Sequence, residues 1–276
     1  LQAGGGGEGD LSWSAVSTTA WDPADGERIT GLRGVGNRLM ASLDDPDASG
    51  ADDRYELVSW AAGVSAGLVL HGEFRDDLRD AARATEAGEE NRVVAVGLGT
   101  LVGVVANITS AGINTSSAAI GNAYGVGLIQ DASGGELFAV ATLDGDVYVQ
   151  TPTSVTSAFV QASGSIDSRA FSDIARIESV TGEERVAVSV FDPAGSLSEI
   201  ADGYREAEVT GTGTGITLDF TSDIGDSYRG SDLARTGIGF MEYISGSDTL
   251  FALTVGTGLW RTTYPSTGAN PDWNWE

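Results

Sequence analysis

The chain contains no cysteine and no lysine, and its 276 residues include a single histidine, His71. Without cysteine it can form neither a disulfide nor a thiolate zinc site, and it lacks a cysteine nucleophile. One histidine, which we place on an outer strand, also argues against a transition-metal site and against Ser-His-Asp catalysis. No run of residues reaches the ~20 apolar positions that a membrane-spanning helix needs.

All 15 basic residues are arginine and stand against 40 acidic ones, so the net charge is −25. Such a chain repels nucleic acid phosphates and acidic membrane surfaces, and we expect neither as a partner. In molar salt the Debye length falls to about 3 Å, which screens the self-repulsion. The acidic, lysine-free composition resembles that of haloarchaeal proteins and of the proteins of their viruses. This resemblance implies a high-salt location on a virion, a cell surface or elsewhere outside the cell; general solubility is the alternative.

An Asp-x-x-Arg element recurs along the chain. It starts at Asp25, Asp80, Asp173 and Asp232, and a degenerate copy starts at Asn122, where Gly125 takes the place of Arg. The five starts are 42 to 59 residues apart. Periods of this size are typical of propellers and solenoids.

Short strands separated by glycine-rich turns are predicted within each unit. Second strands are expected at 38–43, 92–98, 137–143, 185–191 and 250–255. Third strands are expected at 55–60, 101–108, 146–151, 196–200 and 259–263. Fourth strands are expected at 67–74, 116–121, 157–162 and 205–209. Four-stranded units arranged radially form a β-propeller.

Both ends of the repeat need a separate interpretation. Residues 1–10 are rich in glycine and predict a flexible linker. Residues 11–17 precede the first unit at the distance where other units carry a fourth strand, so we expect them to complete the last blade and remove its exposed edge. Local propensity also allows a short helix at 74–79. The expected fold is all-β: a single five-bladed β-propeller of four-stranded blades over residues 11–276, closed by an N-terminal strand.

The C-terminal stretch TLFALTVGTGLWRTTYPSTGANPDW resembles the Asp-box propellers of the sialidase type. Ser266 and Trp273 are seven residues apart, as in that box, while Gly268 and Asn270 replace its Asp and Gly. The resemblance is confined to this one unit. It implies a propeller fold but not sialidase activity, because the box is structural in that family.

The repeated arginines are the first candidate binding residues: Arg28, Arg83, Arg176 and Arg235. Residues three apart in a strand point to opposite faces, so the Asp and Arg of one unit should not pair with each other. We expect each arginine to meet a carboxylate or carbonyl of a neighbouring blade. The alternative is that the four converge on a central channel and bind an anion, as guanidinium groups do well.

Three further candidate sites follow from composition. Trp260, Trp273 and Trp275 could form an aromatic contact patch or pack as an outer strand. The acidic loop 44–53 could bind a structural calcium ion through Asp45, Asp47 and Asp52, although it lacks EF-hand spacing, and a solvated loop is the alternative. Two sequons predict N-glycosylation if the chain is exported, at Asn107 and Asn114. No other cofactor is expected.

The sequence assembles no catalytic constellation, so we expect a non-enzymatic binding or assembly module on an exposed structure. Examples are a receptor-binding spike or tail protein of a haloarchaeal virus and a haloarchaeal cell-surface protein. Its partner would be a protein, a glycan or another virion subunit that contacts rim loops 44–53 and 210–231. The alternative is an exported glycoside hydrolase, which needs two channel-facing carboxyl groups about 5–10 Å apart.

Overall fold

The computed structural model describes strands, turns and two short 3-10 segments. The described residues are 2–5, 11–14, 28–45, 54–61, 68–74, 77–97, 102–116, 120, 122–153, 158–163, 170–178, 184–190, 203–220, 237–254 and 258–263. None of these residues is in an α-helix. Nor does any described segment form a helix with the length and apolar character that crossing a membrane requires.

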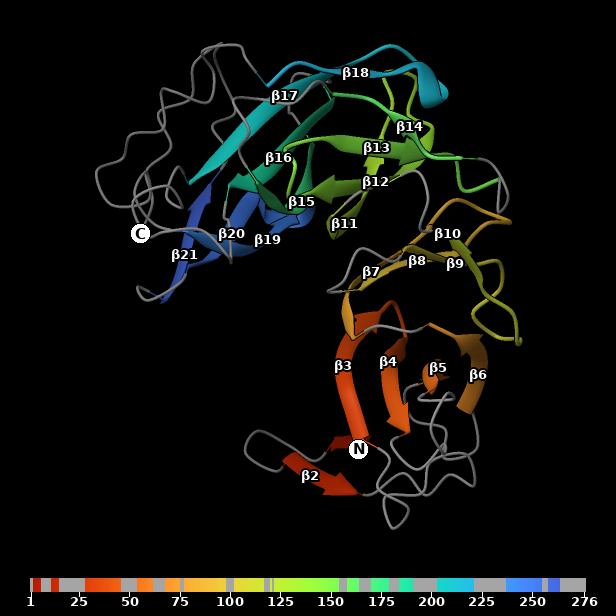
Figure 1. Cartoon of the computed structure of the whole chain (residues 1–276). Coiled ribbons are helices and arrows are strands. Elements are labelled where there is room, and N and C mark those ends of the chain that lie inside the picture. The colour runs from red at the N-terminus through yellow and green to blue at the C-terminus, as the bar shows by residue number, and fades with distance from the viewer. Residues whose placement is uncertain are drawn as a thin grey trace. The chain divides into compact units, whose positions relative to one another are not determined.

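Five antiparallel sheets of three or four strands follow one another along the chain (Figure 1). Sheet 1 comprises β3 (Arg28–Val35), β4 (Arg38–Asp45), β5 (Arg54–Ala61) and β6 (Leu68–Glu73). Sheet 2 comprises β7 (Leu78–Arg83), β8 (Val93–Gly97), β9 (Val102–Val105) and β10 (Asn114–Ser116). Sheet 3 comprises β11 (Ala123–Gln130), β12 (Glu136–Thr142), β13 (Val147–Gln150) and β14 (Val160–Gln161).

Sheet 4 comprises β15 (Phe171–Glu178), β16 (Glu184–Val190), β17 (Tyr204–Thr210) and β18 (Thr217–Leu218). Sheet 5 comprises β19 (Ile238–Ile244), β20 (Thr249–Thr254) and β21 (Gly258–Thr263). In every sheet the strands are hydrogen-bonded in chain order, as a meander. The prediction of an all-β chain built from five successive antiparallel units is therefore confirmed.

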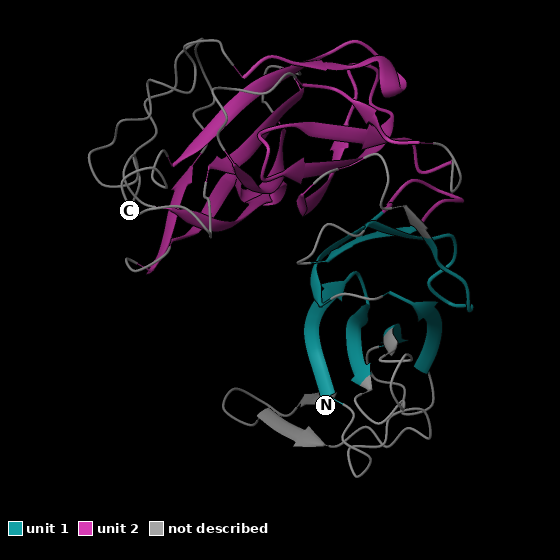
Figure 2. Cartoon of the chain, in the orientation of Figure 1, with its two compact units in different colours: residues 1–83, 91–116 teal, residues 84–90, 117–276 magenta. Residues whose placement is uncertain are grey.

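The chain divides into two compact units (Figure 2). The first contains residues 1–83 and 91–116, and with them sheets 1 and 2. The second contains residues 84–90 and 117–276, and with them sheets 3, 4 and 5.

The second strands of the middle sheets are buried on both faces. All residues of β8 and β12 are buried, and so are all but the first of β16. These strands are near-continuous apolar runs because each of their sheets is covered on both sides. In β20, by contrast, buried and more exposed residues alternate. One face of sheet 5 therefore carries the core and the other is open among the described residues.

A β-bulge recurs at one position of every first strand. The register between the first and second strands skips one residue in each sheet, and the skipped residues are Thr30, Arg79, Tyr124, Ser172 and Gly239. A bulge bends the strand and increases its local twist. Its recurrence shows that the five sheets are copies of one structural unit in one register.

Neighbouring first strands approach closely at the residue after the bulge. A Cβ atom added to Gly31 of β3 would overlap the Leu78 carbonyl oxygen of β7. A Cβ atom added to Gly125 of β11 would lie 2.7 Å from the Cα of Asp173 in β15. Only glycine permits such backbone contact, so both positions fix the spacing between adjacent sheets.

Paired hydroxyl groups connect the bulge of one sheet to the backbone of the next. In sheet 1, Ser42 Oγ lies 2.8 Å from Thr30 Oγ1 and accepts the Leu78 N–H of sheet 2 at 2.8 Å. In sheet 4, Ser172 Oγ lies 2.7 Å from Ser189 Oγ and donates to the Ile238 carbonyl of sheet 5 at 2.9 Å. Ser42 and Ser189 occupy the same register position, opposite the residue that follows the bulge.

The Asp-x-x-Arg element follows this structural repeat in two sheets only. Asp80 and Asp173 come directly after the bulge in sheets 2 and 4. In sheet 1 the corresponding residue is Gly31, six residues after Asp25. In sheet 3 it is Gly125, three residues after Asn122. In sheet 5 it is Phe240, eight residues after Asp232. Strand pairing and burial set the register of a strand. A short sequence element can therefore stand at different distances from the bulge in different sheets.

The N-terminal prediction is wrong for the residues that the structure describes. β1 (Gln2–Gly5) lies within the predicted linker and pairs with β2 (Leu11–Ser14), from Gln2 opposite Ser14 to Gly5 opposite Leu11. The described part of segment 11–17 thus forms a local hairpin and does not pair with sheet 5. Closing so short a loop costs less chain entropy than pairing with a strand far along the sequence.

Two internal predictions also need correction. The segment 205–209, predicted as a fourth strand, belongs to β17, which is the third strand of sheet 4 and pairs with β16. The predicted third strand at 196–200 lies outside the described residues. The helix allowed at 74–79 does not form over 78–79, which begin β7. Burial of Leu78 against sheet 1 overrides the local helix propensity there.

Replacing Gly31 by alanine should lower the thermal unfolding midpoint, because the new methyl group would push β3 away from the Leu78 carbonyl. Overpacking of this kind costs about 1–3 kcal/mol. Gly34 provides a matched control in the same strand, since a Cβ atom added there would meet nothing within 4 Å. Gly34→Ala should be neutral or stabilising by about 0.5–1 kcal/mol. Equal midpoints for the two variants, followed by circular dichroism, would contradict the close approach.

Candidate functional site

The two repeat aspartates that the structure describes bind backbone groups. Asp173 is 4% exposed; its Oδ1 accepts the Ile174 N–H at 2.8 Å and its Oδ2 accepts the Met241 N–H of sheet 5 at 2.6 Å. Asp80 Oδ1 accepts the Ala81 N–H at 2.9 Å and lies 3.6 Å from Arg33 Nε of sheet 1. Each carboxylate therefore joins its own strand to a neighbouring sheet, which is a structural role.

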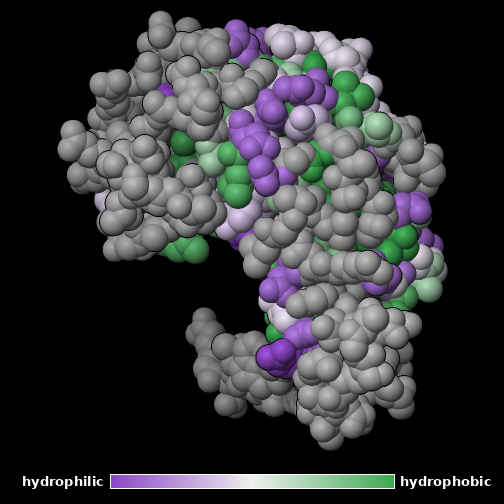
Figure 3. Space-filling model, viewed as in Figure 1, coloured by the Kyte–Doolittle hydropathy of each residue, from purple (hydrophilic) through white to green (hydrophobic). Residues whose placement is uncertain are grey.

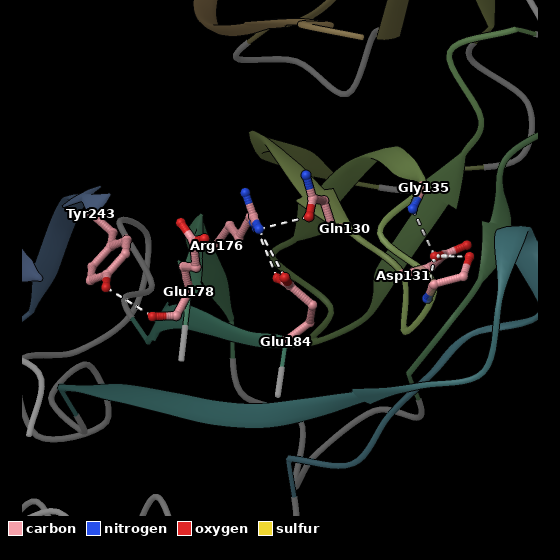
Figure 4. A network of polar contacts seen from close by, with 8 residues as sticks. Gln130, Asp131, Gly135, Arg176, Glu178, Glu184 and Tyr243 are labelled. Atoms are coloured by element: carbon pink, nitrogen blue, oxygen red, sulfur yellow. Dashed lines mark hydrogen bonds and ion pairs between the residues drawn. The ribbon is translucent and has the colours of Figure 1, made fainter. Parts of the chain in front are cut away.

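Arg176 lies at the centre of a polar network at the hairpin end of sheets 3 and 4 (Figure 4). Its Nε and Nη2 donate to the two carboxylate oxygens of Glu184 at 2.8 Å each, and Nη2 also donates to Gln130 Oε1 at 2.7 Å. The hydrogen bonds to Glu184 raise the pKa of Arg176, with some opposition from burial. Arg176 thus pairs mainly within its own hairpin and reaches the neighbouring sheet through an amide oxygen.

The other repeat arginines have different surroundings. Arg83 donates to Asn37 Oδ1 of sheet 1 at 3.1 Å, so it does meet a carbonyl group of the adjacent sheet. Arg28 bonds Asp44 at 2.6 Å, directly across the β3–β4 ladder of its own sheet, and its side chain is 68% exposed. The expected neighbouring-sheet partner is therefore wrong for Arg28. Arg235 lies outside the described residues.

The single histidine is a core residue of the first unit. His71 is 3% exposed and Ser59 is 0% exposed. His71 Nε2 lies 2.8 Å from Ser59 Oγ, and Nδ1 lies 3.1 Å from the Ser110 carbonyl oxygen. Burial lowers the pKa of His71 to about 4, with the Ser110 bond opposing and the Arg38 charge adding to the shift. The ring is therefore neutral at pH 7, and although a serine–histidine pair is present, a substrate cannot reach it.

Asp131 fastens the β11–β12 turn to a loop of sheet 4 (Figure 4 shows its bond to Gly135). Its Oδ1 accepts the N–H groups of Ser133 and Gly135, at 2.8 and 2.9 Å, and its Oδ2 accepts the Gly213 N–H at 2.6 Å. Burial works against the charged form, but these bonds prevail and lower the pKa of Asp131. Asp131 is 4% exposed and holds two loops together.

An accessible polar cluster lies at the β12–β13 turn, which we name the Asp144–Asp146 turn. Asn122 Nδ2 donates to both carboxylate oxygens of Asp144, at 2.9 and 3.0 Å. Gln161 Nε2 donates to Asp146 Oδ1 at 3.0 Å. Asp144 is exposed, Asp146 is partly buried, and Asn122 has a left-handed φ of 52°.

Two groups in this turn have shifted pKa values. Burial raises the pKa of Asp146, and the Asp144 charge adds to the shift while the Gln161 bond opposes it. Burial and both carboxylates raise the pKa of Tyr148 in β13. The arrangement offers acidic acceptors, amide groups and an aromatic ring to a ligand. The sequence indicated only a turn here, because Asn122 and Gln161 arrive from other parts of sheet 3.

The remaining predicted sites are described in part. Trp260 lies on β21 and packs, partly buried, against the core between sheets 4 and 5, whereas Trp273 and Trp275 lie outside the described residues. Asp45 ends β4, and Asp47 and Asp52 lie outside. In the described segments no three His, Cys, Asp or Glu side chains are placed to hold a metal ion. Asn107 lies in the loop after β9, and Asn114 begins the edge strand β10.

Comparison of the chain with known protein families and with curated proteins finds no match.

Arg176→Ala should lower stability by about 1–2 kcal/mol, because Glu184 and Gln130 lose charge-assisted hydrogen bonds. The Arg176 and Glu184 side chains are only 27% and 17% exposed. Arg28→Ala is the matched control: its ion pair is largely solvated, so the loss should stay below about 1 kcal/mol. Thermal unfolding of both variants at one salt concentration measures the difference. An equal or larger loss for Arg28→Ala would contradict the structural role of the Arg176 network.

Proposed function

We propose that the five sheets close into a single five-bladed β-propeller and that this ring is a non-enzymatic binding or assembly module. It would work on an exposed structure in high salt, such as the spike or tail of a haloarchaeal virus or a haloarchaeal cell surface. The observation that carries the proposal is a pair of apolar sheet faces: the face of sheet 1 is exposed at both ends of its row, and the face of sheet 5 is exposed across its three strands. They are the two faces that ring closure would join.

The direction in which each face points follows from the residues after the bulge. The first of them faces the following sheet: Gly125 adjoins Asp173, and Asp173 in turn binds the Met241 N–H. The next residue faces the preceding sheet: Ile174 packs in a core cluster with sheet 3, and Met241 packs in one with sheet 4. The same alternation, applied to the outermost sheets, identifies their unused faces.

Sheet 1 carries an apolar row on the face that would point to a preceding sheet. Leu32, Ala41, Val58 and Leu70 stand directly opposite one another across its four strands. Ala41 and Val58 are buried, whereas Leu32 and Leu70 are 46% and 40% exposed. The row is therefore covered at its centre and open at both ends among the described residues.

Sheet 5 carries an apolar row on the face that would point to a following sheet. Phe240, Leu253 and Leu259 stand directly opposite one another across its three strands. They are 40%, 49% and 64% exposed. Figure 3 shows apolar side chains at the surface in one view of the molecule. Contiguous exposed apolar patches mark interaction surfaces. By analogy with the other sheets, each of these two rows would pack against a neighbouring sheet.

A closed ring suits recognition because it is rigid and leaves the loops at its ends free to vary. Within it, the repeat arginines and Trp260 would support the architecture. Contacts with a protein, a glycan or another virion subunit would come from rim loops 44–53 and 210–231. Loop 44–53 would also hold any structural calcium ion. The charge of −25 favours partners that are neither nucleic acids nor acidic membranes.

The Asp144–Asp146 turn supports a second candidate, an exported glycoside hydrolase. That chemistry needs one carboxyl group that stays protonated and a second that is ionised. Burial and the Asp144 charge raise the pKa of Asp146, which suits it to the acid role, and Tyr148 lies beside the pair. Of the repeat aspartates, Asp173 is a poor candidate, because backbone N–H groups occupy both of its carboxylate oxygens.

Ring closure should bring Leu32 and Phe240 together, because they correspond to Met241 and Asp173, which are in contact across sheets 4 and 5. The chain has no cysteine, so the double variant Leu32→Cys with Phe240→Cys has only two thiols. Oxidation or a short thiol crosslinker should join them within one chain, as non-reducing electrophoresis and intact mass report. Leu32→Cys with Val160→Cys is the control pair and should stay open. Crosslinks formed only between chains would contradict closure.

Binding should be measurable with protein labelled at its N-terminal amine, which is the one amine because the chain has no lysine. The labelled protein should bind haloarchaeal cells in molar NaCl. Replacing loop 46–53 by glycine and serine should weaken binding at least about tenfold, or 1.4 kcal/mol. Asp144→Asn with Asp146→Asn is the control and should bind normally. Hydrolysis of oligosaccharides by the parent chain, lost in that control, would instead establish the hydrolase.

A further inference from the structure

The loop after β9 is anchored by one buried residue. Ile108 is 0% exposed and packs in the core cluster between sheets 1 and 2, with Phe74 and Leu78. Its N–H donates to the Asn91 carbonyl at 2.7 Å, and its own carbonyl lies 3.2 Å from Ser59 Oγ. The residues on either side of Ile108 are consequently held in one conformation at the surface.

Those flanking residues form a sequon that is folded into a compact turn. Asn107 Oδ1 accepts both the Thr109 N–H at 2.9 Å and the Thr109 hydroxyl at 2.7 Å. The Ser110 N–H donates to the Asn107 carbonyl at 3.1 Å. Asn107 is partly exposed, and Thr109 and Ser110 are exposed. The amide oxygen is thus committed to the turn.

This geometry suits the amide nitrogen for modification. Two hydrogen bonds donated to Oδ1 stabilise the negative charge that develops on the amide as its nitrogen loses a proton, since bonds to a charged acceptor are the stronger ones. We propose that Asn107 is a site of N-linked glycosylation and that it is modified in preference to Asn114. The proposal rests on the export that the proposed function requires.

The reaction balances with a lipid-linked oligosaccharide as the donor. A bond forms between Asn107 Nδ2 and C1 of the first sugar, while the bond between C1 and the donor's phosphate oxygen breaks. The phosphate leaves with the bonding electron pair, and the Nδ2 proton passes to a base of the transferase. Oδ1 takes no part in bond formation, so the glycan leaves both hydrogen bonds from Thr109 in place.

Asn114 lies in an extended strand instead of a turn. It begins β10, where it stands opposite Val104 in the ladder with β9, and Ser116 ends the same strand. Residues two apart in a strand are separated by about 6.8 Å along its axis. The extended backbone of β10 therefore does not form the turn that brings the Asn107 amide and the Thr109 hydroxyl together.

The test is the site occupancy of protein secreted from a host with N-glycosylation, measured by intact mass and by glycopeptide mass spectrometry. For this test a flexible tail with an Asn-Gly-Thr sequon is added to the C-terminus. Glycosylation of the tail reports export and transferase activity independently of the fold. Ser116→Thr gives both native sequons the same acceptor residue, so that any remaining preference reflects geometry. Asn107→Gln, Asn114→Gln and Thr109→Val complete the set.

We expect Asn107 to be several-fold more occupied than Asn114, in the parent chain and in Ser116→Thr alike. Asn107→Gln and Thr109→Val should remove that glycan, and Asn114→Gln should retain it. Glycosylation of the tail alone would overturn the inference, and so would equal occupancy of the two sites once Ser116 is threonine. Because the assay contains no ligand, either result leaves the binding function to be judged by its own experiment.

Discussion

The close approach of neighbouring first strands is the constraint on which the rest of the structure depends. Where Gly31 meets the Leu78 carbonyl, and where Gly125 meets Asp173, backbone lies against backbone with no side chain between. That spacing brings the hydroxyl pairs within reach of the next strand, and it lets Asp173 bind the Met241 N–H. These three polar links between sheets are therefore short and buried, and each uses a backbone group of the neighbouring sheet.

Further from the bulges, apolar side chains fill the space between sheets that follow one another along the chain. Sheet 4 buries one face against sheet 3 and the other against sheet 5, which explains why β16 is apolar on both sides. Candidate functional groups are displaced from this interior to the turns. Asp144 and Asp146 lie at such a turn, and Asn107 lies in a loop that one buried isoleucine anchors.

The sequence predicted those features that depend on local patterns. Second strands were recognisable because burial on both faces makes them continuous apolar runs, as in β12. The third strand of sheet 4 was misplaced because the fully buried Glu206 interrupts the apolar alternation of β17. Contacts between residues distant in the sequence could not be predicted, because they depend on the register of the folded strands. Examples are the pairing of β2 with β1 and the bonds from Asn122 and Gln161 to the Asp144–Asp146 turn. The position of the Asp-x-x-Arg element relative to each bulge is a third example.

Phe240 gives the last sheet a property that the others lack. It occupies the position where sheets 1 and 3 have glycine, so its ring would hold a sheet packed on that face further away than Gly31 and Gly125 hold their neighbours. In an array whose stability is a sum over units and the interfaces between neighbouring units, a terminal sheet with one exposed face gains the least from its neighbours. Amide protons of β19 to β21 would then exchange with solvent sooner than those of β12 and β16, through a subglobal opening that leaves sheets 3 and 4 intact.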